Sequence, residues 1–293
     1  MVCDSHIHFI PKELSSLSAF YKGIWSDKEK LYEYLSLNQI KKSLLVSPSF
    51  DINIDAKWLF YTYNKSIIKI AEENKNIIPA GILNLEDIEN LKEQLRELKN
   101  MGFKVVNLFS SYKGKFIIKD IIKYFEDFQN FGFFIFFHPQ TNNPIGFERI
   151  NDPLLMPVLE YTFDLSMCLG ILLMEEVFDK FNIKFIFSSL GGVIPFLKDR
   201  FDRVYIMLRA KNMVKELKDL PSNIFKKIYV DTSGSNVDNI KIALDTFGEN
   251  NVLWGSDYPA NTNIKNNIDS LNKLGSPLKE KIIKNNFLSL FNE

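Results

Sequence analysis

The chain alternates short apolar runs with longer amphipathic ones. Eight runs are rich in β-branched or aromatic residues and end at Gly, Pro, Asn or Ser, as strands do. They read VCDSHIHF, KSLLVSP, IIPAGILN, KVVNLF, FFIFFHP, KFIFSSL, IYVDTSG and VLWGSDYP. The most apolar segment, FGFFIFF from Phe131 to Phe137, predicts a strand that is buried on both faces.

The segments between these strands show the period of an amphipathic helix. In Glu86–Gly102, apolar residues at Ile88, Leu91, Leu95 and Leu98 share one face, and a glycine ends the run. Similar patterns predict helices over Ile117–Gly132, Leu165–Phe181, Val193–Leu217, Val237–Phe247, Lys265–Leu274 and Lys279–Phe291.

Strands that alternate with helices pair in parallel through crossover connections. Eight of them in 293 residues favour a single (β/α)₈ barrel domain over residues 1–293, rather than a doubly wound sheet. The longest irregular stretch, Pro139–Asp164, follows the fifth strand. A long loop at the carboxyl end of a strand predicts a lid or a wall of a substrate site.

Composition narrows the class of protein. The chain is 46% hydrophobic with 26 Phe, which is enough for a large core. Lys plus Arg (36) balance Asp plus Glu (36), so charge gives no reason to expect nucleic acid or an anionic membrane as a partner. With two cysteines, Cys3 and Cys168, and no signal-peptide pattern at the start, we expect a cytoplasmic protein.

All three histidines of the chain lie at the ends of predicted strands. His6 and His8 are two residues apart on the first strand, so their side chains point to the same side. His138 ends the fifth strand, and Asp257 ends the eighth, which neighbours the first in a closed barrel. Three imidazoles and one carboxylate at one rim predict a metal site suited to Zn²⁺, and also to Mn²⁺, Fe²⁺ or Co²⁺.

The sequence resembles the amidohydrolase superfamily over essentially its whole length. DSHIHFIP, FFHPQ, FSSLGGVIPFLKDRFDR, YVDTSG, LWGSDYP and IIKNNFLSLF follow the family's motifs in order. The branch it is most similar to includes aminocarboxymuconate-semialdehyde decarboxylase, resorcylate-type decarboxylases and metal-dependent hydrolases. The resemblance implies that His6, His8, His138 and Asp257 hold the metal. The lysine that bridges two metals in other branches has no counterpart on the fourth strand, which implies one ion.

One position departs from the family pattern. Relatives carry His-x-Gly-Gly at the end of the sixth strand, where the histidine is the expected acid–base group, and Ser189 stands there in SSLGG. A serine hydroxyl donates a hydrogen bond but does not exchange protons near neutral pH. Either Asp257 transfers the proton alone, or Glu148 or Asp164 replaces the histidine, or the protein binds a ligand without turnover.

The leading hypothesis is a metal-dependent hydrolase of a small, anionic substrate. The ion would activate a water molecule, Asp257 would take its proton, and Ser189 would orient the substrate. Arg149 and Arg209 are the predicted substrate-binding residues, because the guanidinium group fits a carboxylate. The resemblance further implies a homodimer. Non-oxidative decarboxylation, a lactonase-like reaction without metal, and a degenerate barrel remain the alternatives.

Overall fold

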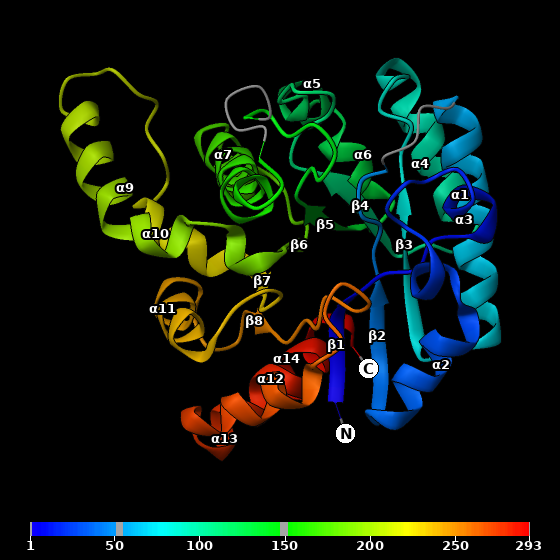
Figure 1. Ribbon diagram of the computed structural model, residues 1–293. Helices are drawn as coiled ribbons and strands as arrows, with labels where there is room; N and C mark the ends of the chain where they lie inside the picture. The colour runs from blue at the N-terminus through cyan, green and yellow to red at the C-terminus, as the bar shows by residue number, and fades with distance from the viewer. Residues whose placement is uncertain (1, 51–54, 147–151, 293) are drawn as a thin grey trace.

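The computed structural model describes residues 2–50, 55–146 and 152–292. Within them, eight parallel strands are hydrogen-bonded in sequence order from β1 to β8 and helices lie outside, so the predicted (β/α)₈ barrel is confirmed (Figure 1). The strands are β1 Val2–Ile7, β2 Ile40–Leu45, β3 Ile77–Ile82, β4 Val105–Phe109, β5 Phe134–His138, β6 Phe185–Phe187, β7 Tyr229–Asp231 and β8 Val252–Leu253.

Each of the seven predicted helical segments contains α-helix, but several are divided into two shorter helices and the ends differ. The segment expected as one helix over Val193–Leu217 ends at Arg209, where the chain turns. The helices are α1 Lys12–Ser15, α2 Lys28–Leu37, α3 Ala56–Glu73, α4 Leu91–Asn100, α5 Ile118–Ile122, α6 Phe125–Asn130, α7 Tyr161–Met174, α8 Val177–Lys180, α9 Ile194–Arg209, α10 Pro221–Ile224, α11 Val237–Phe247, α12 Ile264–Ser270, α13 Ser276–Glu280 and α14 Asn286–Phe291.

Two well-capped helices precede the third strand and were not expected from periodicity. Helices α2 and α3 each begin after an aspartate whose carboxylate accepts a backbone N–H of the first turn, Asp27 from Lys30 and Asp55 from Trp58. Such an N-cap is the signal that identifies a helix start where the apolar stripe is weak.

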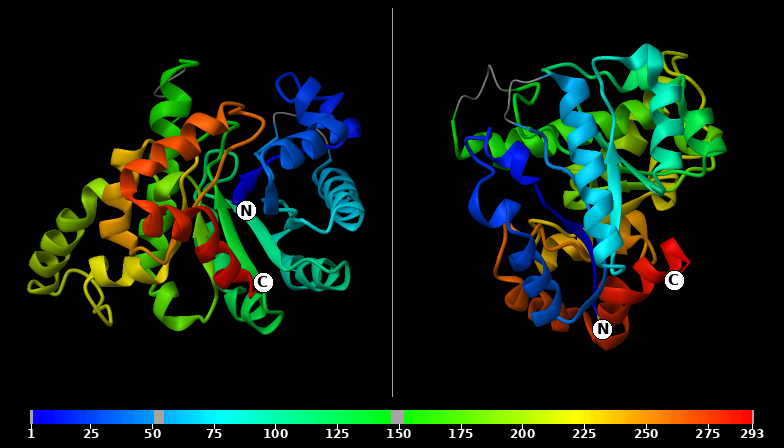
Figure 2. Two further views of the ribbon diagram at one scale, coloured as in Figure 1. Left: turned by 90° about the horizontal axis from the view of Figure 1, so that it is seen from below. Right: turned by 90° about the vertical axis from the view of Figure 1, so that its right-hand side faces the viewer.

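The barrel closes through backbone hydrogen bonds between β1 and the segment after β8. The N–H of Ser5 donates to the carbonyl of Trp254, that of Asp257 to His6, and that of His8 to Tyr258, at 2.7–2.9 Å. His6 and His8 therefore lie on one side of this closure and Asp257 on the other. The two chain ends lie near each other in all three views (Figures 1 and 2).

The long segment after β5 is less irregular than expected. A π-helical turn over Met156–Glu160 leads directly into α7, so Asp164 is a helical residue and not a loop residue. The π-helical turn and α7 form one helix, Met156–Met174, that is long and apolar enough to cross a membrane, with a mean hydropathy of 1.4. In the structure, 44% of this helix is buried. Length and composition alone do not separate a membrane span from a core helix, and Leu165 and Leu169 of this helix are fully buried in the core.

Inside the barrel, β5 shows how the strand period positions the site. Phe136 and His138 are two residues apart and share the inner face, while Ile135 and Phe137 pack against the outer helices. The Phe136 ring lies edge-on to His6, with 5.4 Å between ring centroids, beneath the carboxyl-terminal rim. At the other end, Phe287 and Phe291 of α14 belong to the same inner cluster and close the barrel.

Replacing Phe136 with alanine is expected to lower the free energy of unfolding by about 3–5 kcal/mol, because the barrel interior cannot collapse around the cavity. The side chain is fully buried. Urea denaturation followed by circular dichroism measures the change. The same truncation at Leu37, which is exposed at the end of α2, is expected to stay within about 0.5 kcal/mol. Equal effects at the two positions would contradict the packing described.

Candidate metal centre

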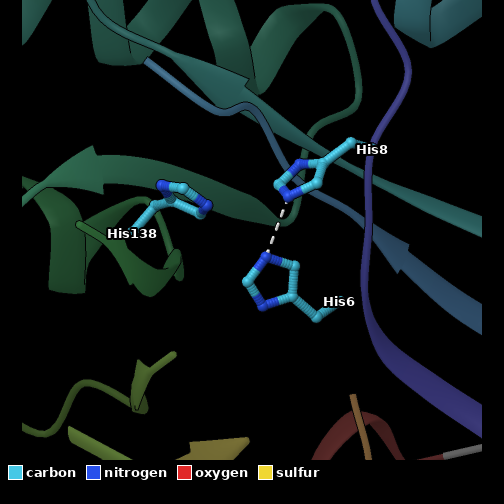
Figure 3. A group of neighbouring side chains, drawn as sticks. All are labelled: His6, His8 and His138. Atoms are coloured by element: carbon cyan, nitrogen blue, oxygen red, sulfur yellow. Dashed lines mark hydrogen bonds between the residues drawn. The ribbon is translucent and has the colours of Figure 1, made fainter. Parts of the chain in front are cut away.

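Three histidines converge at the carboxyl-terminal rim of the barrel. His6 lies on β1, His8 follows it, and His138 ends β5. All three side chains are buried, and one ring nitrogen from each lies within 4.8 Å of the other two (Figure 3). The Nε2 atoms of His6 and His8 are 3.0 Å apart. The strands thus bring together the histidines that the sequence singled out.

The other ring nitrogen of each histidine is held by a group that only accepts hydrogen bonds. Nδ1 of His6 donates to Asp231 Oδ2 at 2.7 Å, that of His8 to the Val46 carbonyl at 2.9 Å, and that of His138 to the Pro139 carbonyl at 2.8 Å. A proton on Nδ1 leaves Nε2 with its lone pair free. Such partners fix the tautomer and orient imidazoles that bind metals.

Asp257 adds a carboxylate to the same cluster. Its Oδ1 lies 3.2 Å from His8 Nε2 and 3.6 Å from His6 Nε2. Three acceptor atoms this close repel one another unless a proton or a cation lies between them. Three imidazoles and one carboxylate are the ligands that a divalent transition metal takes up, so the residues present fit such an ion. A metal at this place would satisfy Nε2 of His6 and His8 together.

The surroundings shift the pKa values of these groups in different directions. Burial, reinforced by the neighbouring imidazoles, lowers the pKa of His8, and it lowers that of His138 well below its ordinary value. Burial also acts to lower the pKa of His6, but the charge and hydrogen bond of Asp231 outweigh it and the pKa is raised. Burial acts to raise the pKa of Asp257, but the hydrogen bond to His8 and the nearby histidine charges leave it lowered.

Metal affinity is therefore expected to fall as the pH drops through the raised pKa of His6, by about tenfold per pH unit, because binding displaces one proton from that imidazole. The pKa values of His8 and His138 are lowered, so these two imidazoles take up protons at lower pH than His6 does. Competition with a chelator between pH 8 and pH 5.5 gives the dissociation constant for Mn²⁺. A constant affinity over this interval would contradict the assignment.

Asp231 connects the metal site to the turn after β6. Its Oδ1 accepts the backbone N–H groups of Ser189 and Ser233 and the Ser233 hydroxyl, while Oδ2 accepts His6 Nδ1. The contact with His6 was missed, because β7 and β1 are 225 residues apart along the chain and no local pattern joins them.

Replacing Asp231 with asparagine is expected to weaken metal binding by about 10–100-fold. The asparagine amide has one oxygen to accept hydrogen bonds from both His6 Nδ1 and the N–H groups of Ser189 and Ser233. If the oxygen faces the two serines, the NH₂ group donates to His6 Nδ1 and selects the wrong tautomer. If the oxygen faces His6, the NH₂ group opposes the two N–H groups. Asp164→Asn is the matched control, because Asp164 is also buried but accepts from the Ser110 and Ser111 hydroxyls. Similar losses of metal in both variants would contradict a positioning role for Asp231.

Ser189 lies where the turn after β6 faces the cavity. Its φ is 48°, in the left-handed region, as is the φ of Asp257 at 64°. Both residues line the same cavity as the histidines. The hydroxyl of Ser189 is 3.2 Å from that of Ser233. Backbone conformations that are unfavourable for non-glycine residues are concentrated at functional sites, which agrees with the placement of these two.

The other predicted groups lie elsewhere. Asp164 is held by Ser110 and Ser111, and it is not among the described residues that line the metal cavity. Arg209 ends α9 and pairs with Glu216 at 2.7 Å, and it is not among the described residues that line that cavity. Its predicted role in substrate binding stays a prediction. Glu148 and Arg149 lie outside the described residues.

The histidines open into a cavity of about 970 Å³. Its deep end holds His6, His8, His138 and Asp257, and its walls are mostly apolar. Trp25 stacks on the His8 ring with 5.7 Å between centroids, which the sequence did not indicate. A cavity of this size with a few convergent polar groups is typical of a small-molecule site.

Comparisons with known proteins agree with this geometry. Residues 3–286 match the amidohydrolase family. A curated relative is 2-amino-3-carboxymuconate-6-semialdehyde decarboxylase of Dictyostelium discoideum, 24% identical over 213 residues, which are 70% of this chain. The match spans 57% of that relative's own length.

Solved structures share the fold over the whole chain. The 5-carboxyvanillate decarboxylase of Novosphingobium aromaticivorans, complexed with manganese and 4-hydroxy-3-methoxy-5-nitrobenzoic acid, has a TM-score of 0.84 at 18% identity, covering 100% of this chain and 96% of that one. The 2,6-dihydroxybenzoate decarboxylase from Rhizobium has a TM-score of 0.78 at 17% identity, covering 99% and 98%. The family match confirms the predicted family: this chain belongs to the amidohydrolase family, and its three buried histidines fit a metal ion.

Proposed function

We propose that the protein is a non-oxidative decarboxylase of a small aromatic or unsaturated carboxylic acid. The observation that carries the proposal is the convergence of three histidine side chains at the deep end of a mostly apolar cavity. The relative from Dictyostelium and the two solved enzymes named above are decarboxylases, which supports this reaction over the hydrolysis expected from the sequence.

His6, His8, His138 and Asp257 would hold a divalent ion, which would supply Lewis-acid polarisation of a substrate oxygen. The apolar walls hold the body of the acid and exclude water from it. As CO₂ leaves, the electrons of the broken C–C bond stay on the substrate carbon, which must receive a proton. We assign that transfer to Asp257, the carboxylate among the described lining residues, which would first take a proton from water and then pass it to that carbon. Ser189 orients the substrate by hydrogen bonding and does not titrate.

The ligand set indicates a divalent transition metal but does not identify which one. The nitrogen-rich ligand set that the sequence predicts favours Zn²⁺, whereas one of the decarboxylases that share the fold was solved with manganese. We propose one ion per chain, and reconstitution with Zn²⁺ and Mn²⁺ in turn, followed by elemental analysis, decides between them. Arg149 remains the proposed partner of a substrate carboxylate, and a homodimer remains the proposed assembly.

The direct test is release of CO₂ by the metal-reconstituted protein. We expect turnover of 2-hydroxybenzoate, 2,6-dihydroxybenzoate or a related acid, lost on chelation and restored by adding back the ion. The same preparation is offered phenyl esters and lactones. Hydrolysis of these without CO₂ release from any acid would contradict decarboxylation.

Hydrolysis is the second candidate, and Ser189 is the observation that favours it. A decarboxylase must protonate carbon, so the loss of an imidazole from the sixth strand affects it more than a hydrolase. The assay above distinguishes the two reactions in one preparation.

A further inference from the structure

We propose that the substrate carries an uncharged apolar extension that runs from its acid group at the histidines to the mouth of the cavity. This inference rests on the proposed function, because the acid group is placed at the metal centre. The acid end is matched by the three histidines and Asp257. The extension is matched by two apolar walls that continue from this deep end to the surface.

The first wall is a continuous series of aromatic rings. Trp25 stacks on His8, Tyr21 lies 4.8 Å from Trp25, and Phe20 lies 5.1 Å from Tyr21 and 5.8 Å from Trp25, measured between ring centroids. All four line the metal cavity. His8 is buried, whereas Phe20 is 68% exposed. The wall therefore reaches from the metal centre to solvent.

The second wall faces the same cavity from α7 and α9. The π-helical turn contributes Met156 and Val158, α7 contributes Phe163, and the first turn of α9 contributes Phe196, which is 62% exposed. Large apolar side chains that are exposed singly are normal, but a group of them around one opening marks a binding surface. Helices α7 and α9 lie next to each other beside the barrel (Figure 1).

Size and charge both point to such a ligand. The cavity of about 970 Å³ is at the upper end of the roughly 300–1,000 Å³ that hold drug-sized ligands, and a single-ring acid would leave most of its walls in contact with water. The described lining residues include no Lys, Arg or Glu, and their one carboxylate and three imidazoles all lie at the deep end. An extension that fits these walls is neutral.

The test uses metal-loaded protein and a series of ligands with one acid group. The probes are 2-hydroxybenzoate and its 4-alkyl derivatives from methyl to hexyl, in which the alkyl chain points away from the carboxylate. Calorimetric titration is expected to show affinity rising about fourfold per methylene, the value for burying one CH₂ group, until the chain reaches solvent. Affinity that stays constant along the series, while the parent acid binds, would overturn the inference.

Matched variants locate the effect in the walls. Phe20→Ser and Phe196→Ser are expected to weaken binding of the hexyl probe by about tenfold or more and to leave 2-hydroxybenzoate within about twofold. The controls are Leu17→Ser and Met207→Ser, which change residues that are 53% and 50% exposed but do not line the cavity. Equal losses in variants and controls would also overturn the inference.

The outcomes separate this inference from the proposed reaction. If affinity rises with the length of the alkyl chain but no probe releases CO₂, the inference of an apolar extension is supported and the proposed decarboxylation is contradicted. Release of CO₂ with affinity that ignores chain length would do the opposite.

Discussion

His138→Ala is expected to abolish stoichiometric metal binding and to lower turnover by at least about 10³-fold. The ion contributes several kcal/mol of transition-state stabilisation, and each 1.36 kcal/mol is a factor of ten in rate. His138 supplies the ligand that comes from the opposite side of the barrel to β1, so His6, His8 and Asp257 cannot replace it. Elemental analysis after dialysis against Mn²⁺ or Zn²⁺ measures the loss.

Gln140→Ala is the matched control for this change. Gln140 lies two residues after His138 and is equally buried, but its side chain lines a different cavity beside β3 and β4. We expect full metal content in this variant. Retention of one tightly bound ion by His138→Ala would show that the metal is held elsewhere.

Ser189→His is expected to leave metal content unchanged and to raise turnover by about 10²-fold or more. General acid–base help is worth 10²–10⁴-fold, and an imidazole titrates near neutral pH whereas a hydroxyl does not. The new side chain has room because position 189 lines the cavity, and its φ of 48° is one that histidine adopts more readily than most residues. The pH dependence of turnover should acquire a limb near the pKa of imidazole.

Ser189→Ala separates the two roles of this position. If the native hydroxyl only orients the substrate, the alanine variant should show a modest rise in KM, and the pH dependence of its turnover should be unchanged. A fall in turnover for Ser189→His, with metal retained, would mean that the serine belongs to a site adapted to work without the imidazole.

The barrel was predictable because its signals are local. Each strand is a short apolar run, and the order of strands follows the order of the chain. The helix ends were less predictable. Helix α9 stops at Arg209 although apolar residues continue to Leu217, because a turn beginning at Ala210 ends the helix before them.

The site was predictable where residue type alone restricts the chemistry. The chain has three histidines, and the strand period places His6 and His8 together, so the metal cluster followed from the sequence. The partners of their Nδ1 atoms did not follow, since a backbone carbonyl such as that of Val46 carries no sequence signal. The aromatic wall that begins at Trp25 lies in a segment with no recognisable period, and it becomes visible only in three dimensions.

Metal binding is also expected to stabilise the closure of the barrel, because the ligands lie next to the hydrogen bonds that join β1 to the segment after β8. His8 and Asp257 are separated by 249 positions along the chain. An ion that binds both would therefore cross-link β1 to the segment that follows β8. Any ligand that binds the folded chain alone adds RT ln(1 + [L]/Kd) to its stability. Binding of the metal should thus raise the melting temperature. Removal of the metal should make the hydrogen bonds between β1 and the segment after β8 open before those of the rest of the sheet. During synthesis, an ion cannot connect His8 to Asp257 until the 249 positions that separate them have been made.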